Sequence, residues 1–208
     1  MFLFIDRMIE ELDQGLRVLS GAVSAHRDVE FPEPVIELND EQKKMSAKLM
    51  RVNHTGEVCA QALYLGQAAV EKNGDIKIEL IQSAREELDH LAWTQQRIKE
   101  LGGATSVLNP LFYGGSFAVG LLAGLFGTQT SLGFLQETER QVESHLSDHL
   151  ERLPVEDVRS RAIISQMKQE ERVHADRAKL LGASMLPKPV TAAMGLMSKA
   201  MTRTTFII

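Results

Sequence analysis

The chain has 208 residues, enough for one domain, and its 44% hydrophobic and 25% charged residues are the balance of a globular protein. Its net charge of −5 at pH 7 argues against nucleic-acid binding as the main task, because surfaces that bind nucleic acid are basic. Its single cysteine, Cys59, excludes an internal disulfide framework and fits a reducing compartment.

Residues 1–39 are predicted to form an N-terminal helix and a linker. Within residues 1–25, apolar side chains recur at helical spacing from Leu3 to Leu19, with acidic residues between them. The first apolar run is short and acidic residues follow it, so we expect no secretory signal there. The helix either packs on the rest of the protein or lies on a membrane surface. Two prolines mark the linker that follows.

Two long helices are predicted next. The first begins after Asn39, which can form a capping box with Gln42, and runs to about Lys72. The second runs from about Asp75 to Leu101 and stops at a pair of glycines. Each of these helices has an apolar stripe that is interrupted by polar residues.

The sequence has no charged residue in the stretch 102–136. A helix that spans a membrane needs about 20 apolar residues, and this stretch is of borderline length and interrupted by many glycines. Three interpretations stay open. The stretch is the start of a buried helix, an apolar patch that docks into one leaflet of a membrane, or a true membrane span.

Two more helices and a tail complete the chain. The third core helix leaves the uncharged stretch and ends before Pro154. The fourth runs from about Val158 to Leu181 and is closed by Gly182. Residues 187–208 then form a basic amphipathic tail with an apolar end.

Two motifs echo each other along these helices. Glu87 and His90 stand three residues apart on the second core helix, and Glu171 and His174 repeat that spacing on the fourth. Residues three apart leave the same face of a helix, and both pairs interrupt an inward apolar stripe. A lone inward glutamate on the preceding helix completes each half of the pattern. The full set is Glu57, Glu87, His90, Glu139, Glu171 and His174.

This set predicts a pair of metal ions. Buried carboxylates repel one another, and each unpaired buried charge costs several kcal/mol. Two divalent cations balance four negative charges, and four-helix bundles hold two ions with this ligand pattern. Oxygen and nitrogen ligands without thiolate suit iron or manganese better than structural zinc. The alternative is that the six residues pair with arginines at a solvated surface.

Several neighbouring residues compete with or support this set. Glu143 lies one turn from Glu139, but Glu139 has the more apolar surroundings and is the one we choose. Glu86 and Glu170 fall off the inward stripes and are predicted to face solvent. Three further residues are either ordinary packed or exposed side chains or partners that orient a ligand. They are His54, Tyr64 and His145.

The segment Arg51-Val-Asn-His-Thr-Gly-Glu57, followed by the two Glu-x-x-His pairs, resembles the demethoxyubiquinone hydroxylases of ubiquinone biosynthesis. The resemblance covers roughly residues 40–182; the Glu-x-x-His pairs alone are shared with ferritins and other di-iron proteins. It implies an all-α protein whose residues 40–186 form a ferritin-like four-helix bundle, with an extra N-terminal helix and the apolar interhelix segment 102–136. It also implies that the six residues named above are iron ligands.

The resemblance further implies a reaction and a location. Two iron ions, the expected cofactor, react with O2, one oxygen atom hydroxylates the ring of a polyprenyl quinol, and the other leaves as water. No catalytic residue beyond the metal ligands is expected. The partner surface is a membrane, with the protein peripheral on the cytoplasmic face of the bacterial inner membrane, and the uncharged stretch agrees with this. A homo-oligomer or a partner protein of ubiquinone synthesis stays open.

Two rival functions are considered. One is a ferritin-like iron-binding or storage protein without an organic substrate, which the long uncharged stretch and the Met-rich tail oppose. The other is a structural or membrane-adaptor bundle without metal. No Gly-x-Gly-x-x-Gly fingerprint occurs, so the electron donor of a hydroxylase stays open between a small reductant, the quinol pool and a partner protein.

Overall fold

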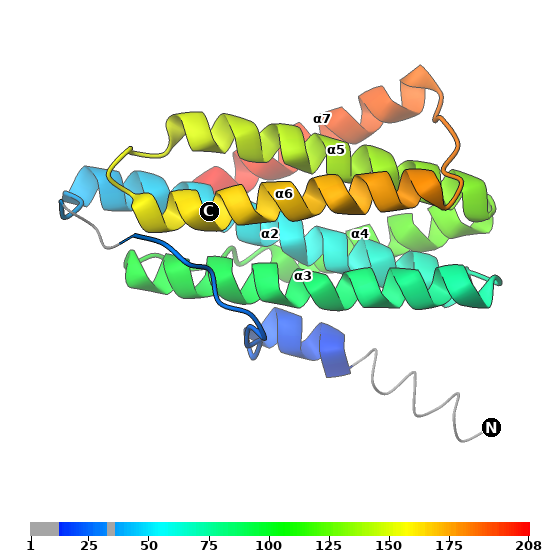
Figure 1. Cartoon of the computed structure of the whole chain (residues 1–208), viewed down its shortest axis with the longest axis horizontal. Coiled ribbons are helices and arrows are strands. Elements are labelled where there is room, and N and C mark those ends of the chain that lie inside the picture. The colour runs from blue at the N-terminus through cyan, green and yellow to red at the C-terminus, as the bar shows by residue number, and fades with distance from the viewer. Residues whose placement is uncertain (1–12, 33–35) are drawn as a thin grey trace.

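The computed structural model describes residues 13–32 and 36–208 (Figure 1). Within these ranges the regular elements are all helices, so the predicted all-α class is confirmed. A short helical segment covers residues 13–20. The longer helices are α2 (Asp40–Val70), α3 (Gly74–Glu100), α4 (Asn109–Leu125), α5 (Thr128–Arg152), α6 (Val158–Leu180) and α7 (Lys188–Ile207).

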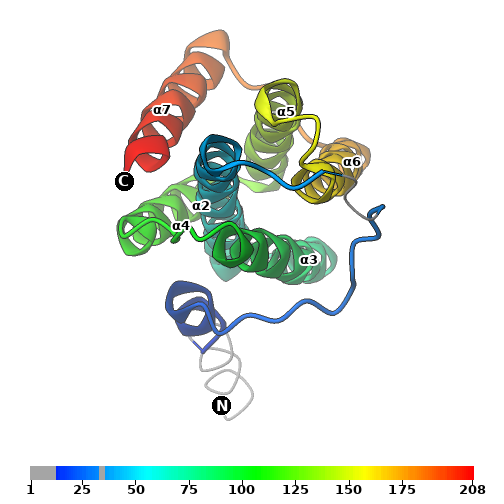
Figure 2. The same cartoon turned by 90° about the vertical axis from the view of Figure 1, so that its left-hand side faces the viewer.

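Four of these helices form the central bundle. α2 packs on α3 and α5 packs on α6, and contacts between α2 and α5 and between α3 and α6 close the four-sided arrangement (Figure 2). α4 lies outside this bundle against α2, and α7 covers parts of α2 and α5. The interior of the bundle therefore receives side chains from four helices.

The ends of the core helices follow from local chemistry. The Asn39 side chain accepts a 2.9 Å hydrogen bond from the Gln42 backbone, and the Gln42 side chain accepts one from the Asn39 backbone, which is the predicted capping box. Gly102 and Gly182 have φ of 72° and 100°, a conformation that favours glycine and ends a helix. The predicted bounds of the four core helices are met within about two residues, except at the start of α5.

Two other predictions are corrected. The N-terminal helix was expected over residues 1–25, but in the described part it ends near Ser20, because Gly21 has φ of 72°. Residues 1–12 lie outside the described residues. The non-helical segment 22–32, which we call the strap, then crosses α3 beside α6 (Figure 1). The uncharged stretch does not run straight into the third core helix: it forms the separate helix α4, and Gly127 with φ of 98° precedes α5.

Glycines let α4 lie directly on the backbone of α2. A Cβ atom at Gly66 of α2 would collide with the carbonyl oxygen of Phe117, and one at Gly120 of α4 would collide with that of Leu63. The two helix backbones are therefore closer than any larger side chain permits. This contact places one face of the uncharged stretch in the protein interior and leaves the other face outside.

Replacing Gly66 or Gly120 with alanine is expected to lower the free energy of unfolding by about 3 kcal/mol, because the two backbones must separate. Gly114→Ala is the matched control on α4, since its Cβ would meet nothing within 4 Å. A helix gains about 0.5–1 kcal/mol from that change. Urea unfolding followed by circular dichroism measures both effects, and equal stability of the three variants would contradict the close contact.

Candidate metal centre

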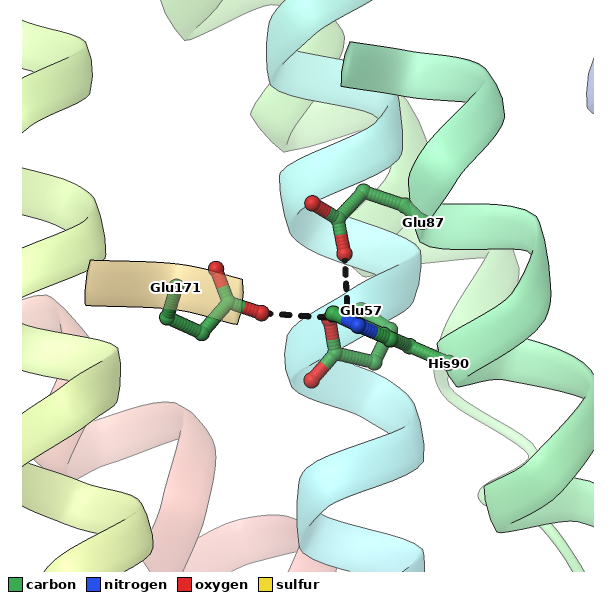
Figure 3. A group of neighbouring side chains, drawn as sticks. All are labelled: Glu57, Glu87, His90 and Glu171. Carbon is green, nitrogen blue, oxygen red and sulfur yellow. Dashed lines mark ion pairs between the residues drawn. The ribbon is translucent and has the colours of Figure 1, made fainter. Parts of the chain in front are cut away.

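Six side chains from four helices meet in the middle of the bundle. Each of them is at most 4% exposed, although positions this deep in a bundle are ordinarily apolar. Figure 3 shows four of them, with the carboxyl groups from α2, α3 and α6 turned toward the edge of one imidazole ring. The six are Glu57 on α2, Glu87 and His90 on α3, Glu139 on α5, and Glu171 and His174 on α6.

The distances divide the cluster into two halves, one around each histidine. His90 Nδ1 lies 2.9 Å from Glu87 Oε2, 3.1 Å from Glu171 Oε1 and 3.5 Å from Glu57 Oε2. His174 Nδ1 lies 3.2 Å from Glu87 Oε1 and 3.6 Å from Glu171 Oε2. Glu87 and Glu171 therefore each direct one carboxylate oxygen to one half and the other oxygen to the other half, which suits a carboxylate shared by two ions.

The sixth residue belongs to the second half. Glu139 is fully buried and interacts with Glu171 and with the charge of His174, whereas the competing Glu143 is only half-buried. Its burial agrees with the choice made from the apolar surroundings in the sequence. The terminal carboxylates are thus Glu57 beside His90 and Glu139 beside His174.

The residues fit a pair of cations because their inward atoms face one another in close ion-pair contacts but have no hydrogen-bond partner. A buried polar atom without a hydrogen bond costs about 1–3 kcal/mol, and a folded protein tolerates only a few per 100 residues. Here the atoms are close together, yet their directions make no hydrogen bond with one another. The unpartnered atoms are Glu57 Oε2, both carboxylate oxygens of Glu87, Glu139 and Glu171, and the Nδ1 atoms of His90 and His174.

The same crowding shifts the titration of these groups. Burial raises the pKa of Glu57 and of Glu139 well above the ordinary value, and the charge of Glu171 adds to the shift. Burial alone would lower the pKa of His90 and His174, but the surrounding carboxylates raise it instead. Without cations the cluster therefore holds protons, and cations must displace them.

The outer nitrogen of each histidine is held by a carboxylate from the opposite helix. His90 Nε2 lies 2.8 Å from Glu170 Oε2, and His174 Nε2 lies 2.8 Å from Glu86 Oε2. An Nε2–H that donates to a carboxylate leaves Nδ1 free as a metal ligand. The prediction that Glu86 and Glu170 face solvent is wrong; their side chains are 27% and 17% exposed.

A signal for these two residues is present in the sequence. α3 and α6 both contain the pattern Gln-x-x-x-Glu-Glu-x-x-His, as Gln82 to His90 and Gln166 to His174. In both copies a second glutamate comes directly before the ligand glutamate. Helical periodicity, which only assigns residues to an inward or an outward face, does not register this repeat.

The three residues predicted to orient ligands have different surroundings. Tyr64 is fully buried near Glu139, and its ring stands edge-on to His174 with centroids 6.2 Å apart. His54 instead lies with Nδ1 3.4 Å from Asn109 Nδ2 of α4, and burial lowers its pKa to about 4. The His145 ring contacts that of His149, with centroids 3.9 Å apart and the planes tilted by 57°. Among the contacts of the described residues, only Tyr64 keeps its predicted place beside the cluster.

A cleft of about 770 Å³ lies on the outer side of the cluster, between α3, α6 and the N-terminal segment. Half of its twelve lining residues carry charged side chains. Its charged lining residues are Arg27, Arg85, Glu86, Asp89, Glu170 and Arg177.

Known proteins of one family are similar to this chain over nearly its whole length. The family model described as "Ubiquinone biosynthesis protein COQ7" matches residues 44–205. A 3-demethoxyubiquinol 3-hydroxylase of Nitrosomonas europaea is 54% identical over 203 residues, covering 97% of this chain and 98% of the relative. A protein of the same description from Azoarcus sp. is 53% identical over 198 residues, covering 95% and 96%.

One solved structure shares the fold at low sequence identity. It is a dodecameric thioferritin from Bacteroides fragilis, with a TM-score of 0.55 and 16% identity, covering 80% of this chain and 90% of that one. Its likeness supports the predicted ferritin-like bundle. At this identity it carries nothing about assembly or activity.

Proposed function

The chain belongs to the COQ7 family of ubiquinone biosynthesis proteins, and we propose that its buried cluster holds two iron ions with which it hydroxylates the ring of a polyprenyl demethoxyubiquinol. Its relatives over nearly the full length are 3-demethoxyubiquinol 3-hydroxylases, so this chain is a monooxygenase of that kind. The observation that carries the iron assignment is the group of unpartnered carboxylate and imidazole atoms within the bundle.

Each residue has a definite task in this reading. Glu87 and Glu171, which face both histidines, would help to hold both ions, while Glu57 with His90 and Glu139 with His174 would each hold one of them. Paired iron ions, when bound, supply the activation of O2 that amino-acid side chains cannot provide. The four helices keep the six side chains at most 4% exposed, which would limit the access of water to bound ions.

The alternative of a storage protein without an organic substrate is not favoured. The relatives that match almost the entire chain are described as hydroxylases, and the ferritin-type likeness is one of fold alone. A storage role would predict iron far in excess of two ions per chain.

The test is a single-turnover reaction with isotope-labelled oxygen. The chain is loaded anaerobically with two Fe²⁺ per molecule, mixed with a short-tailed demethoxyubiquinol, and exposed to ¹⁸O₂. One ¹⁸O atom is expected in the ring of the product and the other in water. Unlabelled product, or consumption of O2 without product at full iron occupancy, would refute the hydroxylase assignment.

The location stays a proposal of its own: the protein binds the cytoplasmic face of the inner membrane as a peripheral protein. Its support is an apolar outer face on α4, together with a substrate class whose prenyl tail resides in lipid. Within the described residues, no helix combines the length and the apolarity needed to cross a membrane. The exposed side chains of this face, which recur at helical spacing, are Leu111, Leu122, Leu125 and Phe126.

The double substitution Leu122→Glu/Leu125→Glu is expected to reduce binding to anionic lipid vesicles at least about tenfold, because each buried apolar side chain contributes about 1.5–3 kcal/mol. These side chains are 57% and 69% exposed, so folding and iron content should not change. Ile78→Glu on α3, at a position 66% exposed, is the matched control. Vesicle cosedimentation measures binding, and equal loss in the control would argue against docking by α4.

A further inference from the structure

We propose that the strap completes the metal centre, with Arg27 as a positioning residue that acts on the ligand His90 through Glu170. This inference rests on the proposed metal site but not on the hydroxylation reaction. The strap lies before residue 44, where the match to the family model begins, and it does not belong to the four-helix bundle.

A continuous chain of short contacts leads from the strap to the cluster. Both terminal nitrogens of Arg27 donate to the carboxylate of Glu170, at 2.7 and 3.0 Å, which is a bidentate pair. The same carboxylate lies 2.8 Å from His90 Nε2. Gln166 also donates to Glu170, at 2.6 Å, so Arg27 and Gln166 together fix this carboxylate. Because His90 Nδ1 faces the cluster, the direction of this ligand atom depends on where Glu170 is held.

The strap itself is fixed on both sides of this contact. The backbone N–H of His26 donates to Asp89 at 2.7 Å, and the indole N–H of Trp93 donates to the carbonyl oxygen of Arg27 at 2.6 Å. The Arg27 Nε–H also donates to Asp89, at 2.7 Å, and its guanidinium lies 5.3 Å from the centre of the Trp93 ring. The Arg27 side chain is half exposed, yet three hydrogen bonds and the contact with the Trp93 ring restrict its position.

The other half of the centre shows what Arg27 replaces. In α6 the residue three positions after His174 is Arg177, which lies 3.3 Å from Glu86, the carboxylate that holds His174. In α3 the residue three positions after His90 is Trp93, so this helix has no arginine at the matching place. The guanidinium for that half comes from the strap and stacks on Trp93.

A second difference between the repeats explains how the strap is recruited. The residue before the ligand histidine is Asp89 in α3 and Val173 in α6. Asp89 is 4% exposed and accepts from the strap at both of its oxygens, whereas Val173 is 53% exposed and has no group that could do so. The two halves therefore have the same Glu–His clamp, but one clamp is completed from within the bundle and the other from outside it.

The test compares Arg27→Gln with Arg177→Gln as its matched counterpart. Manganese(II) titration of metal-free protein gives the affinities of the two ions, and Mössbauer spectra of ⁵⁷Fe-loaded protein report the two iron sites separately. Loss of an outer partner of a ligand typically costs 10–100-fold in metal affinity. We expect Arg27→Gln to weaken the binding of one ion by at least about tenfold and to shift the Mössbauer signal of one iron site. We expect Arg177→Gln to weaken the binding of the other ion and to shift the signal of the other site.

Further variants separate positioning from folding. Glu170→Gln is expected to reproduce the affinity loss of Arg27→Gln, and the double variant to add little, because both changes break one chain of contacts. Arg27→Lys should not restore the metal affinity, since an ammonium group cannot make the bidentate pair with Glu170. Two ions bound with wild-type affinity in Arg27→Gln, or equal weakening of both ions, would overturn the inference. Normal metal binding without hydroxylation would instead refute only the proposed reaction, and a wild-type chain that takes no metal would refute both.

Discussion

Replacing Glu171 with alanine is expected to remove both metal ions and to lower ring hydroxylation by at least about a thousandfold, because removing ligands to catalytic ions removes the activation of O2. Its two oxygens lie 3.1 Å from His90 Nδ1 and 3.6 Å from His174 Nδ1, so one side chain serves both halves. Glu139→Ala should be as inactive but should keep the ion beside His90, because Glu139 belongs to one half only.

Glu143→Ala is the control for these two variants. Glu143 lies one turn from Glu139 on α5 but is only half-buried, so both ions and most of the activity should remain. Iron per chain and the rate of ring hydroxylation are the two measurements. Retention of two ions by Glu171→Ala, or their complete loss from Glu143→Ala, would show that the ligand assignment is wrong.

The stability of the metal-free variants separates ligand loss from unfolding. The pKa of Glu139 is raised by burial and by the charge of Glu171, so its ionised form is unfavourable in the fold without cations. Metal-free Glu139→Gln should therefore be at least as stable as metal-free wild type. Denaturant unfolding in the presence of a chelator measures this, and a loss of more than about 1 kcal/mol would mean that the Glu139 carboxylate supports the apo fold.

The core helices and the six cluster residues were predictable because the 3.6-residue period of the α-helix places all of them. A ligand on the inward stripe of a helix replaces an apolar residue, so Glu57, Glu87 and Glu171 stand out against leucine and alanine neighbours. The glycines and the capping box then mark where the helices end. These signals are local, and local signals are available without knowledge of how helices pack.

Glu86 and Glu170 were not predicted because their role depends on a contact between helices. Each lies at the border of an inward face, where periodicity alone assigns it to solvent, and its partner histidine is 80 residues away for Glu170 and 88 for Glu86. Which border residue meets which histidine is decided by the relative shift of α3 and α6. A single-helix pattern does not contain that shift.

The separate helix α4 and the contacts of the strap, most of which was expected as a linker, were not predicted for related reasons. In the sequence, the glycines of the uncharged stretch were interpreted as interruptions of a helix. In the structure, Gly120 lets α4 contact the backbone of α2. The strap has no periodic pattern at all, and Arg27 finds Asp89 62 residues further along the chain. The position of the strap is set by its contacts with Asp89 and Trp93 on α3, and no sequence spacing links these residues to the strap.

Loading with two divalent cations is expected to raise the midpoint of thermal unfolding by about 20 °C at pH 8. Each ion at about 1,000 times its dissociation constant adds about 4 kcal/mol, so the two add about 8 kcal/mol, and each kcal/mol is worth about 2–4 °C in a domain of this size. The physical source is the set of carboxylate and imidazole atoms that have no hydrogen-bond partner and would become ligands when cations bind. Manganese(II) serves as the ion, because it does not consume O2 during the melt, and the Glu171→Ala variant, which lacks a ligand of both ions, should show almost no gain.

The stabilisation by bound cations should increase as the pH rises from 6 to 9. Burial raises the pKa of Glu57 and Glu139, and the surrounding carboxylates raise the pKa of His90 and His174 against the effect of burial. Groups with a raised folded pKa stabilise the metal-free protein at low pH, and that stability is lost as the pH rises through the folded pKa. Cations replace these protons, so the gap between loaded and metal-free protein grows by about 1.4 kcal/mol per pH unit for each proton displaced. Melts at pH 6, 7.5 and 9 measure it, and a gap that stays constant or narrows would mean that the cluster holds no displaceable protons.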